Sequence, residues 1–187
     1  DLDNPSFLAI DPQQRYLYAV NEVGSFEGKT TGAVAAFHIN PITKELEYLN
    51  KKPTHGTAPC YLSVDKTARY VQVANYSGGS ICMLPIKDDG QLGDATDVIK
   101  HHGSSINQQR QEGPHPHSII NDPSNQYVFV PDLGLDEILV YKLDLEHGKL
   151  KPNDEPWVQI KAGAGPRHFT FHPNGCHAYL INELDST

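Results

Sequence analysis

Three side chains of complementary chemistry, His117, Arg167 and Glu183, stand at two recurring positions of an internal repeat in this sequence. An imidazole with an ordinary pKa of about 6.5 is largely neutral at pH 7 and can accept a proton. A guanidinium can fork onto a carboxylate, a phosphate or a developing oxyanion. Glu183 could orient Arg167 or act as the base itself, and the sequence leaves both roles open. Together the three types predict general acid–base chemistry on an anionic substrate.

The repeat consists of four segments that align without a gap. Each opens with a proline, runs through alternating apolar residues, turns, and reaches Asn or Asp sixteen positions after the proline. The opening residues are Pro5, Pro59, Pro116 and Pro166, and the end residues are Asn21, Asn75, Asp132 and Asn182. Turn signals such as Asp-Pro and His-Pro separate the two apolar runs, which predicts an antiparallel hairpin in each segment. The four end residues are expected to cap turns through their own side chains.

Further strands are predicted after each complete hairpin, at residues 32–39, 79–86 and 136–143, with an edge-like stretch at 46–49. Helical periodicity is absent over any useful length. Four antiparallel strands per repeat of fifty to fifty-seven residues are typical of a β-propeller blade, and propellers close with four to eight blades. We therefore predict an all-β chain in which residues 1–187 form a partial propeller domain. Its repeats start near residues 5, 59, 116 and 166, and the last one is incomplete.

This architecture brings the candidate residues to one rim. The first strand of each blade lines the central channel and the second returns antiparallel to it, so positions one and seventeen after each proline should meet at one mouth. The first position holds Ser6, Cys60, His117 and Arg167, and the second holds Glu22, Tyr76, Leu133 and Glu183. The pattern of prolines, strands and turns repeats in all four segments, whereas the residue types at these two positions differ from one segment to the next. We therefore predict catalytic roles for His117, Arg167 and Glu183, and substrate-binding roles for His115, His168 and Glu22. The alternative is a structural Arg–Glu ion pair beside a solvated histidine.

Composition and missing motifs exclude several other classes of function. A formal net charge of −8 without a basic run argues against nucleic acid or an anionic membrane surface as a partner. No stretch is apolar for long enough to be a transmembrane helix. Cys60, Cys82 and Cys176 are widely spaced, which predicts free thiols in a reducing compartment. No third ligand accompanies His115 and His117 at a metal-binding spacing, so neither a metal nor another cofactor is expected. Serine-hydrolase, Walker and dinucleotide motifs are also absent.

Over essentially its whole length the chain resembles the lactonase family of seven-bladed propellers. The most specific stretches are GPHPHS at 113–118, VPDLG at 130–134, GPRH at 165–168 and NEL at 182–184. Family members carry a proposed active-site His, Arg and Glu in these motifs, which match His117, Arg167 and Glu183, and a further basic residue in a later blade. The resemblance implies that this chain is about half of a seven-bladed propeller. It also implies a metal-independent carboxylic-ester hydrolase of the pentose phosphate pathway, which converts 6-phosphogluconolactone to 6-phosphogluconate.

Two other functions remain open at this point. The same trio could close a lactone ring in a carboxymuconate-type cycloisomerase, and a propeller rim can serve as a non-catalytic binding scaffold. For the lactonase we expect a small anionic lactone as the partner, a cytoplasmic location, and a monomer or weak dimer when the propeller is full length.

Overall fold

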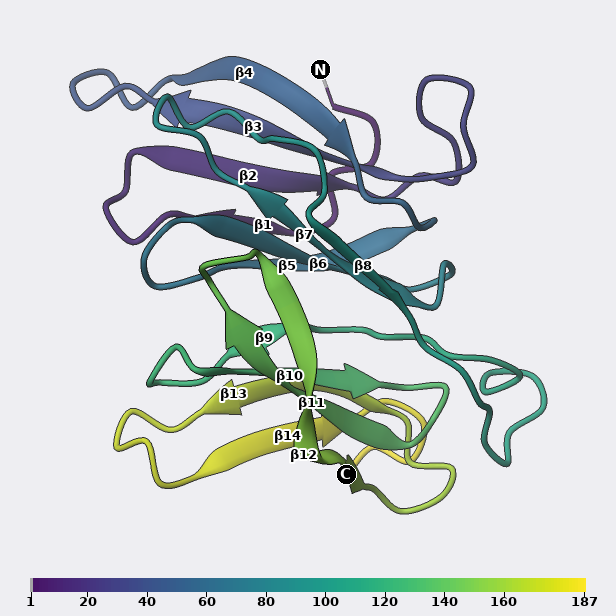
Figure 1. Cartoon of the computed structure of the whole chain (residues 1–187). Helices are drawn as coiled ribbons and strands as arrows, with labels where there is room; N and C mark the ends of the chain where they lie inside the picture. Colours follow the sequence, from purple (N-terminus) through teal and green to yellow (C-terminus); the bar gives the residue numbers. More distant parts are fainter. Residues whose placement is uncertain (1) are drawn as a thin grey trace.

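A computed structural model describes residues 2–187, which form four antiparallel sheets stacked one after another along the chain (Figure 1). The first sheet contains β1 (Leu8–Ile10), β2 (Tyr16–Asn21), β3 (Ala33–Ile39) and β4 (Leu46–Pro53). The second contains β5 (Pro59–Val64), β6 (Tyr70–Asn75), β7 (Ser80–Pro85) and β8 (Asp97–Lys100). The third contains β9 (Ile120–Asn121), β10 (Tyr127–Asp132), β11 (Glu137–Asp144) and β12 (Lys149–Gln159), and the fourth contains β13 (Pro166–Phe171) and β14 (Ala178–Asn182). The predicted all-β class and four-stranded blades are confirmed, with the fourth blade represented by one hairpin.

The hairpins of the first three blades are closed by the aspartate that each turn carries. A carboxylate oxygen of Asp11 accepts the backbone N–H groups of Arg15 and Tyr16 at 2.6 and 2.7 Å. Asp65 and Asp122 each accept two successive N–H groups in the same way, at 2.7 to 2.8 Å. Each carboxylate thus satisfies two donors at the start of the second strand, and the turn signals of the sequence have this physical basis.

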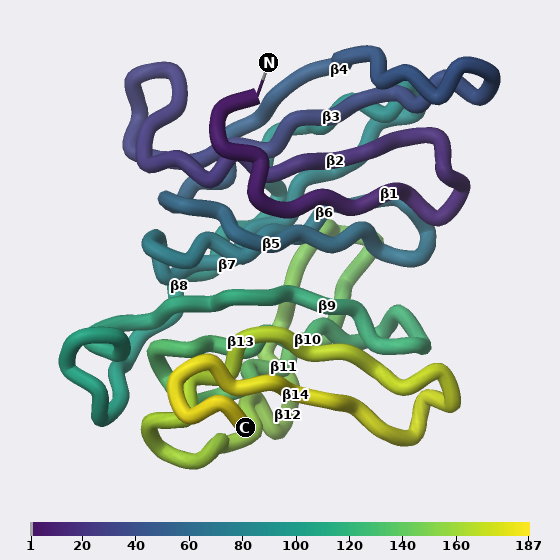
Figure 2. The backbone as a smooth tube through the Cα atoms, turned by 180° about the vertical axis from the view of Figure 1, so that it is seen from behind, coloured from purple at the N-terminus to yellow at the C-terminus, as the bar shows by residue number. Residues whose placement is uncertain are grey.

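Strand register returns each hairpin to the rim from which it started. Pro59 pairs with Asn75, Pro166 pairs with Asn182, and Pro116 forms an isolated bridge with Asp132. The first strands also follow one another through the molecule, since β1 contacts β5 and β5 contacts β9 (Figure 2). The predicted geometry of one shared rim is therefore present.

Turn capping by the repeated end residues holds in three of the four blades. Asn75 Nδ2 donates to Ser80 Oγ at 3.2 Å, Asp132 accepts the Gly134 N–H at 3.0 Å, and Asn182 Nδ2 donates to Thr187 Oγ1 at 3.0 Å. Asn21 differs, because its Nδ2 donates to the carbonyl of Asp3, eighteen residues away. A long loop rather than a tight turn follows Asn21, so no local partner is close.

The core lies between the blades, where each sheet buries one face against the next. The first interface gathers buried side chains of the first two blades around Tyr18, Val34, Leu62 and Val73. The second joins the next pair of blades around Met83, Ile119, Val130 and Tyr141. Burying one such side chain stabilises the fold by about 1.5 to 3 kcal/mol. Stacking of Phe129 on Phe169, with ring centroids 5.4 Å apart, continues the packing into the fourth blade.

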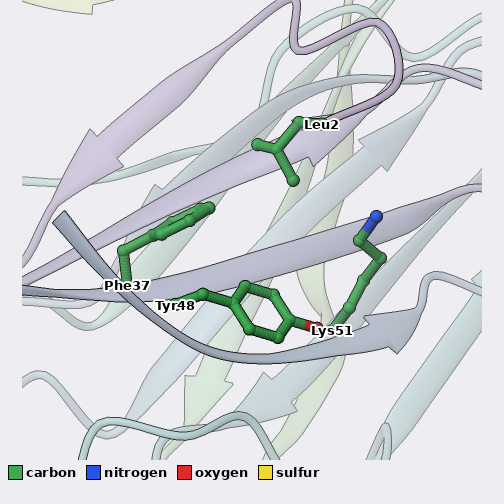
Figure 3. Close-up of a pocket in the computed structure, with 4 residues that line it drawn as sticks. All are labelled: Leu2, Phe37, Tyr48 and Lys51. Carbon is green, nitrogen blue, oxygen red and sulfur yellow. The ribbon is translucent and has the colours of Figure 1, made fainter.

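The outer faces of the first and last sheets are open. Phe37, Tyr48, Leu2 and Lys51 surround a hollow of about 480 Å³ over β3 and β4 (Figure 3). On the fourth sheet, Tyr179 and Ile181 are 58 and 56% exposed. No helix within residues 2–187 is long and apolar enough to cross a membrane.

Candidate active site

A β-bulge places Arg167 at the rim. Pairing of β13 with β14 shifts register between Pro166 and His168, so Arg167 is the unpaired residue. β5 has the same shift around Cys60. A bulge re-aims one side chain out of the regular alternation. The bulges therefore turn the side chains of Arg167 and Cys60 out of the regular alternation of their strands.

Arg167 and Glu183 meet across this hairpin, as predicted. Arg167 Nη1 donates to Glu183 Oε2, and the Glu183 backbone N–H donates to the carbonyl of Gly165 at 2.7 Å. The Arg167 side chain is 42% exposed and that of Glu183 is 21% exposed. The pair is thus partly desolvated and open to a small molecule from one side.

His117 comes from the neighbouring blade and faces the same place. Its backbone N–H donates to Pro131 at 3.0 Å, and its ring lies edge-on to those of His168 and Tyr76, at centroid distances of 5.2 and 5.5 Å. Burial, and then the positive charge of Arg167, lower the pKa of His117 to about 4. The imidazole is therefore neutral at pH 7 and can accept a hydrogen bond or a proton.

A second arginine, which the sequence reasoning missed, completes the cluster. Arg110 Nη2 donates to Glu183 Oε1 and, at 3.3 Å, to the hydroxyl of Tyr76. Burial alone would raise the pKa of Glu183, but the bond from Arg110 and the charge of Arg167 outweigh burial and lower it. Glu183 is therefore an ionised carboxylate with one guanidinium on each oxygen. The only signal in the sequence was a lone cation in the polar loop between β8 and β9.

The three predicted substrate-binding residues have different surroundings. His168 lies beside Arg167 on β13, and burial, followed by the Arg167 charge, lowers its pKa. Glu22 lies close enough to the mouth for its charge to act on the Cys60 thiol. His115 instead stacks on Tyr76 at 4.6 Å, with Nδ1 3.1 Å from the Tyr76 carbonyl and Nε2 3.2 Å from the Glu112 carboxylate. Because both ring nitrogens of His115 face protein acceptors, its geometry favours support of Tyr76 over substrate contact.

Cys60 lies close to His117, with Sγ 3.9 Å from Nδ1, and this pair could suggest a thiol nucleophile with its base. Burial raises the pKa of the thiol to about 12, and the negative charge of Glu22 adds to the shift. Sγ also lies 3.5 Å from the His117 carbonyl oxygen. Since the thiolate is the reactive form, Cys60 is an inert packing residue under the site.

Two buried aspartates hold the segments that carry these side chains. Asp132 accepts the His115 backbone N–H at 2.7 Å and His101 Nδ1 at 2.7 Å, and the hydroxyl of Tyr141 donates to His101 Nε2 at 3.1 Å. His101 directly follows β8 in a polar stretch of the sequence, and its side chain is only 1% exposed. This buried hydrogen-bond network fixes the geometry of the segment that leads to His117.

Asp136 performs the same task for the Arg167 segment. Its carboxylate accepts the N–H groups of Gly163 and Gly165 at 2.7 and 2.8 Å, and the hydroxyl of Ser105 at 2.5 Å. Gly165 in turn accepts the Glu183 N–H. One carboxylate therefore links the Arg167–Glu183 hairpin to the loop that carries Arg110.

An open depression of about 380 Å³ adjoins the cluster. It is lined by Arg167, His168, Ile181, Asn182, Glu183 and Ser186. Within residues 2–187, no group of three or more His, Cys, Asp or Glu side chains is arranged to hold a metal ion. The chemistry available at this rim is that of a neutral imidazole, two guanidiniums and a bound carboxylate.

Fold and site together define part of a β-propeller whose blades gather acid–base and cationic groups at one rim. The chain belongs to the family described as lactonase, 7-bladed beta-propeller, whose model matches residues 1–187. It forms about half of such a propeller.

Similar proteins support this assignment. The chain is 35% identical over 185 residues to a 6-phosphogluconolactonase of Bacillus subtilis, covering 99% of this chain and 50% of that protein. It is 33% identical to a 6-phosphogluconolactonase of Formosa agariphila, covering 97 and 51%. The solved structure of a periplasmic gluconolactonase from Pseudomonas aeruginosa superposes with a TM-score of 0.90 at 38% identity, covering 97% of this chain and 51% of that one. The chain thus spans about half the length of the curated relatives that it matches.

Proposed function

We propose that the protein hydrolyses a sugar-acid lactone, with 6-phosphogluconolactone as the substrate and 6-phosphogluconate as the product. Membership of the lactonase family and the names of its relatives support this activity. The single observation that carries the proposal is the convergence of neutral His117 with the Arg167–Glu183 pair at one rim. Ester hydrolysis needs a proton acceptor for water and a cation for the developing oxyanion.

In the proposed reaction, His117 is the base and Glu183 holds Arg167. Both Glu183 oxygens are occupied by arginines, so this carboxylate is a poor proton acceptor. His117 Nε2 has no protein hydrogen-bond partner within residues 2–187, whereas its Nδ1 faces Cys60. Water would attack the lactone carbonyl carbon and give a proton to Nε2. As the ring C–O bond breaks, that proton would pass to the leaving oxygen.

The electrostatics of this step depend on the charge that develops beside Arg167. With a pKa of about 4, protonating His117 at pH 7 costs about 4 kcal/mol in the free site. Part of that cost comes from the Arg167 charge. An oxyanion on Arg167 neutralises this charge, so the base becomes stronger as the tetrahedral intermediate forms.

The test is hydrolysis of 6-phosphogluconolactone by the full-length protein, with His117→Gln as the variant. We expect a fall in kcat/KM of about 10²-fold or more, because loss of a positioned general base typically costs this much. His177→Gln is the matched control, since His177 is exposed in the turn at the opposite rim. Unchanged activity in His117→Gln would overturn the role of His117. Turnover of a carboxymuconate lactone without turnover of the sugar lactone would overturn the proposed substrate.

We also infer a cytoplasmic protein that is monomeric or weakly dimeric at full length. Cys60, Cys82 and Cys176 are all free thiols, and Cys176 is exposed, which suits a reducing compartment. Cell fractionation tests the location, and sedimentation of the full-length protein tests the oligomeric state.

A further inference from the structure

Arg110 reaches the site from the loop between β8 and β9, which is not part of the repeated hairpins. Arg110 uses one nitrogen, Nη2, for both of its contacts, with Glu183 and with the Tyr76 hydroxyl. Its Nη1 and Nε therefore have no protein acceptor within residues 2–187. Glu112, the acidic residue on the same loop, pairs with His115 instead. The Arg110 side chain is 43% exposed, so its unused N–H donors are accessible to a ligand.

Arg167 has the same arrangement on the other side of Glu183. It donates through Nη1 to Oε2, while Arg110 donates to Oε1. The Glu183 carboxylate thus lies between the two guanidiniums, and each guanidinium keeps further N–H groups that it does not use for Glu183. Two separate cationic positions suit a substrate with two centres of negative charge, a developing oxyanion and a fixed anionic group.

The Arg110 position is built into the loop by long-range contacts. Ser105 donates to Asp136, which also holds the backbone next to Arg167. Gln111, adjacent to Arg110, is fully buried, and its side-chain amide donates to the carbonyl of Leu133 at 2.9 Å. The backbone N–H of Asn107 donates to the Gln111 side-chain oxygen at 3.0 Å. Because the loop is anchored on both sides of Arg110, it loses little further conformational entropy when a ligand binds to this arginine.

We propose that Arg110, together with the hydroxyl of Tyr76, binds the fixed anionic group of the substrate, a phosphate ester, while Arg167 serves the reacting carbonyl. This inference rests on the proposed lactonase function. It assigns substrate selectivity to a residue of the loop between β8 and β9 rather than to the two repeated positions after each opening proline.

The experiment compares two lactones that differ only in the phosphate, 6-phosphogluconolactone and gluconolactone, in the full-length protein. Arg110→Ala should lower kcat/KM for the phosphorylated lactone by about 30-fold or more, mainly through KM, because a charged hydrogen-bonded pair is lost. Any loss of kcat/KM for gluconolactone, which would report the lost contact with Glu183, should be at least about tenfold smaller. Tyr76→Phe should show a smaller change with the same selectivity, and Arg110→Lys should recover part of the loss. Arg69→Ala, an exposed arginine at the opposite rim, is the matched control.

An equal loss on both lactones would mean that Arg110 acts only through Glu183, which overturns the proposal. Equilibrium binding of 6-phosphogluconate and gluconate, measured by calorimetry, separates this inference from the lactonase proposal because it needs no turnover. Tighter binding of the phosphorylated acid, abolished by Arg110→Ala, supports the subsite even if no lactone is hydrolysed. Equal affinity of the wild-type protein for the two acids refutes it.

Discussion

Replacing Arg167 by alanine should separate the electrostatic role of this residue from its structural one. The side chain is 42% exposed and makes its ion pair at the rim, where such pairs contribute about 1 kcal/mol or less to stability. The hydroxyl of Ser118 donates to the Arg167 backbone carbonyl at 2.9 Å, a contact that alanine keeps. Arg167→Ala should therefore fold, with its melting temperature lowered by only a few degrees.

Activity should respond far more strongly than stability. A cation positioned at a developing oxyanion is worth about 2.7 to 4 kcal/mol, so kcat/KM should fall by about 10²-fold or more. Arg167→Lys should recover only part of the loss, because a point charge cannot reproduce a forked contact. Ser6→Ala, at the equivalent position of the first blade, is the control and should have little effect.

The pH profile supplies an independent readout for the same variant. The Arg167 charge is the second largest cause, after burial, of the lowered pKa of His117. Removing it should raise that pKa from about 4 toward the ordinary value, so the acid limb of kcat/KM should move to higher pH. Steady-state kinetics between pH 4 and 9, with circular dichroism at each pH, measure both effects. Wild-type activity in Arg167→Ala, or loss of activity only through unfolding, would refute the reasoning and make the Arg167–Glu183 pair structural.

Five further outcomes are expected. The wild-type protein should keep its activity from pH 8 to about 5 and lose it as pH falls toward 4, because protonation removes the neutral form of His117. The free energy of unfolding should fall earlier, as pH drops from about 6.5 to about 4, since in this range the unfolded chain binds a proton at His117 that the native chain does not. His117→Gln should flatten this dependence in denaturant titrations. Asp136→Asn should lower the free energy of unfolding by about 1 to 3 kcal/mol, as measured by urea titration, because the carboxylate accepts three hydrogen bonds; an unchanged midpoint would contradict its anchoring role. Chelation should leave lactonase turnover intact, and recovery of a lost activity by adding Ca²⁺ or Zn²⁺ would disprove this. The 187-residue chain by itself should self-associate through open faces such as that of Tyr179 and Ile181, so a single sharp monomer in sedimentation would count against this prediction.

Local sequence was sufficient to predict the blades and their shared rim. The turn aspartates, the opening prolines and the alternating apolar runs act over only a few residues, and they fix hairpin register wherever they occur. The four-stranded sheets and their antiparallel pairing followed from these signals, and family resemblance supplied the count of seven blades. Because the frame repeats, the placement of Arg167 and Glu183 on one hairpin could be deduced by counting from Pro166.

Tertiary structure alone decided which side chains the frame brings into contact. Nothing local marks His101 as buried, since its partners Asp132 and Tyr141 lie thirty-one and forty residues away. Arg110 is likewise directed to Glu183, seventy-three residues away, by a loop whose conformation depends on Asp136. Propensity and periodicity act along a strand or a turn, whereas loop conformation and burial depend on which distant groups satisfy the donors and charges of the loop. The rim could therefore be found from the sequence. The position of Arg110, and the fact that both Glu183 oxygens are bound by arginines, depend on how the blades pack together.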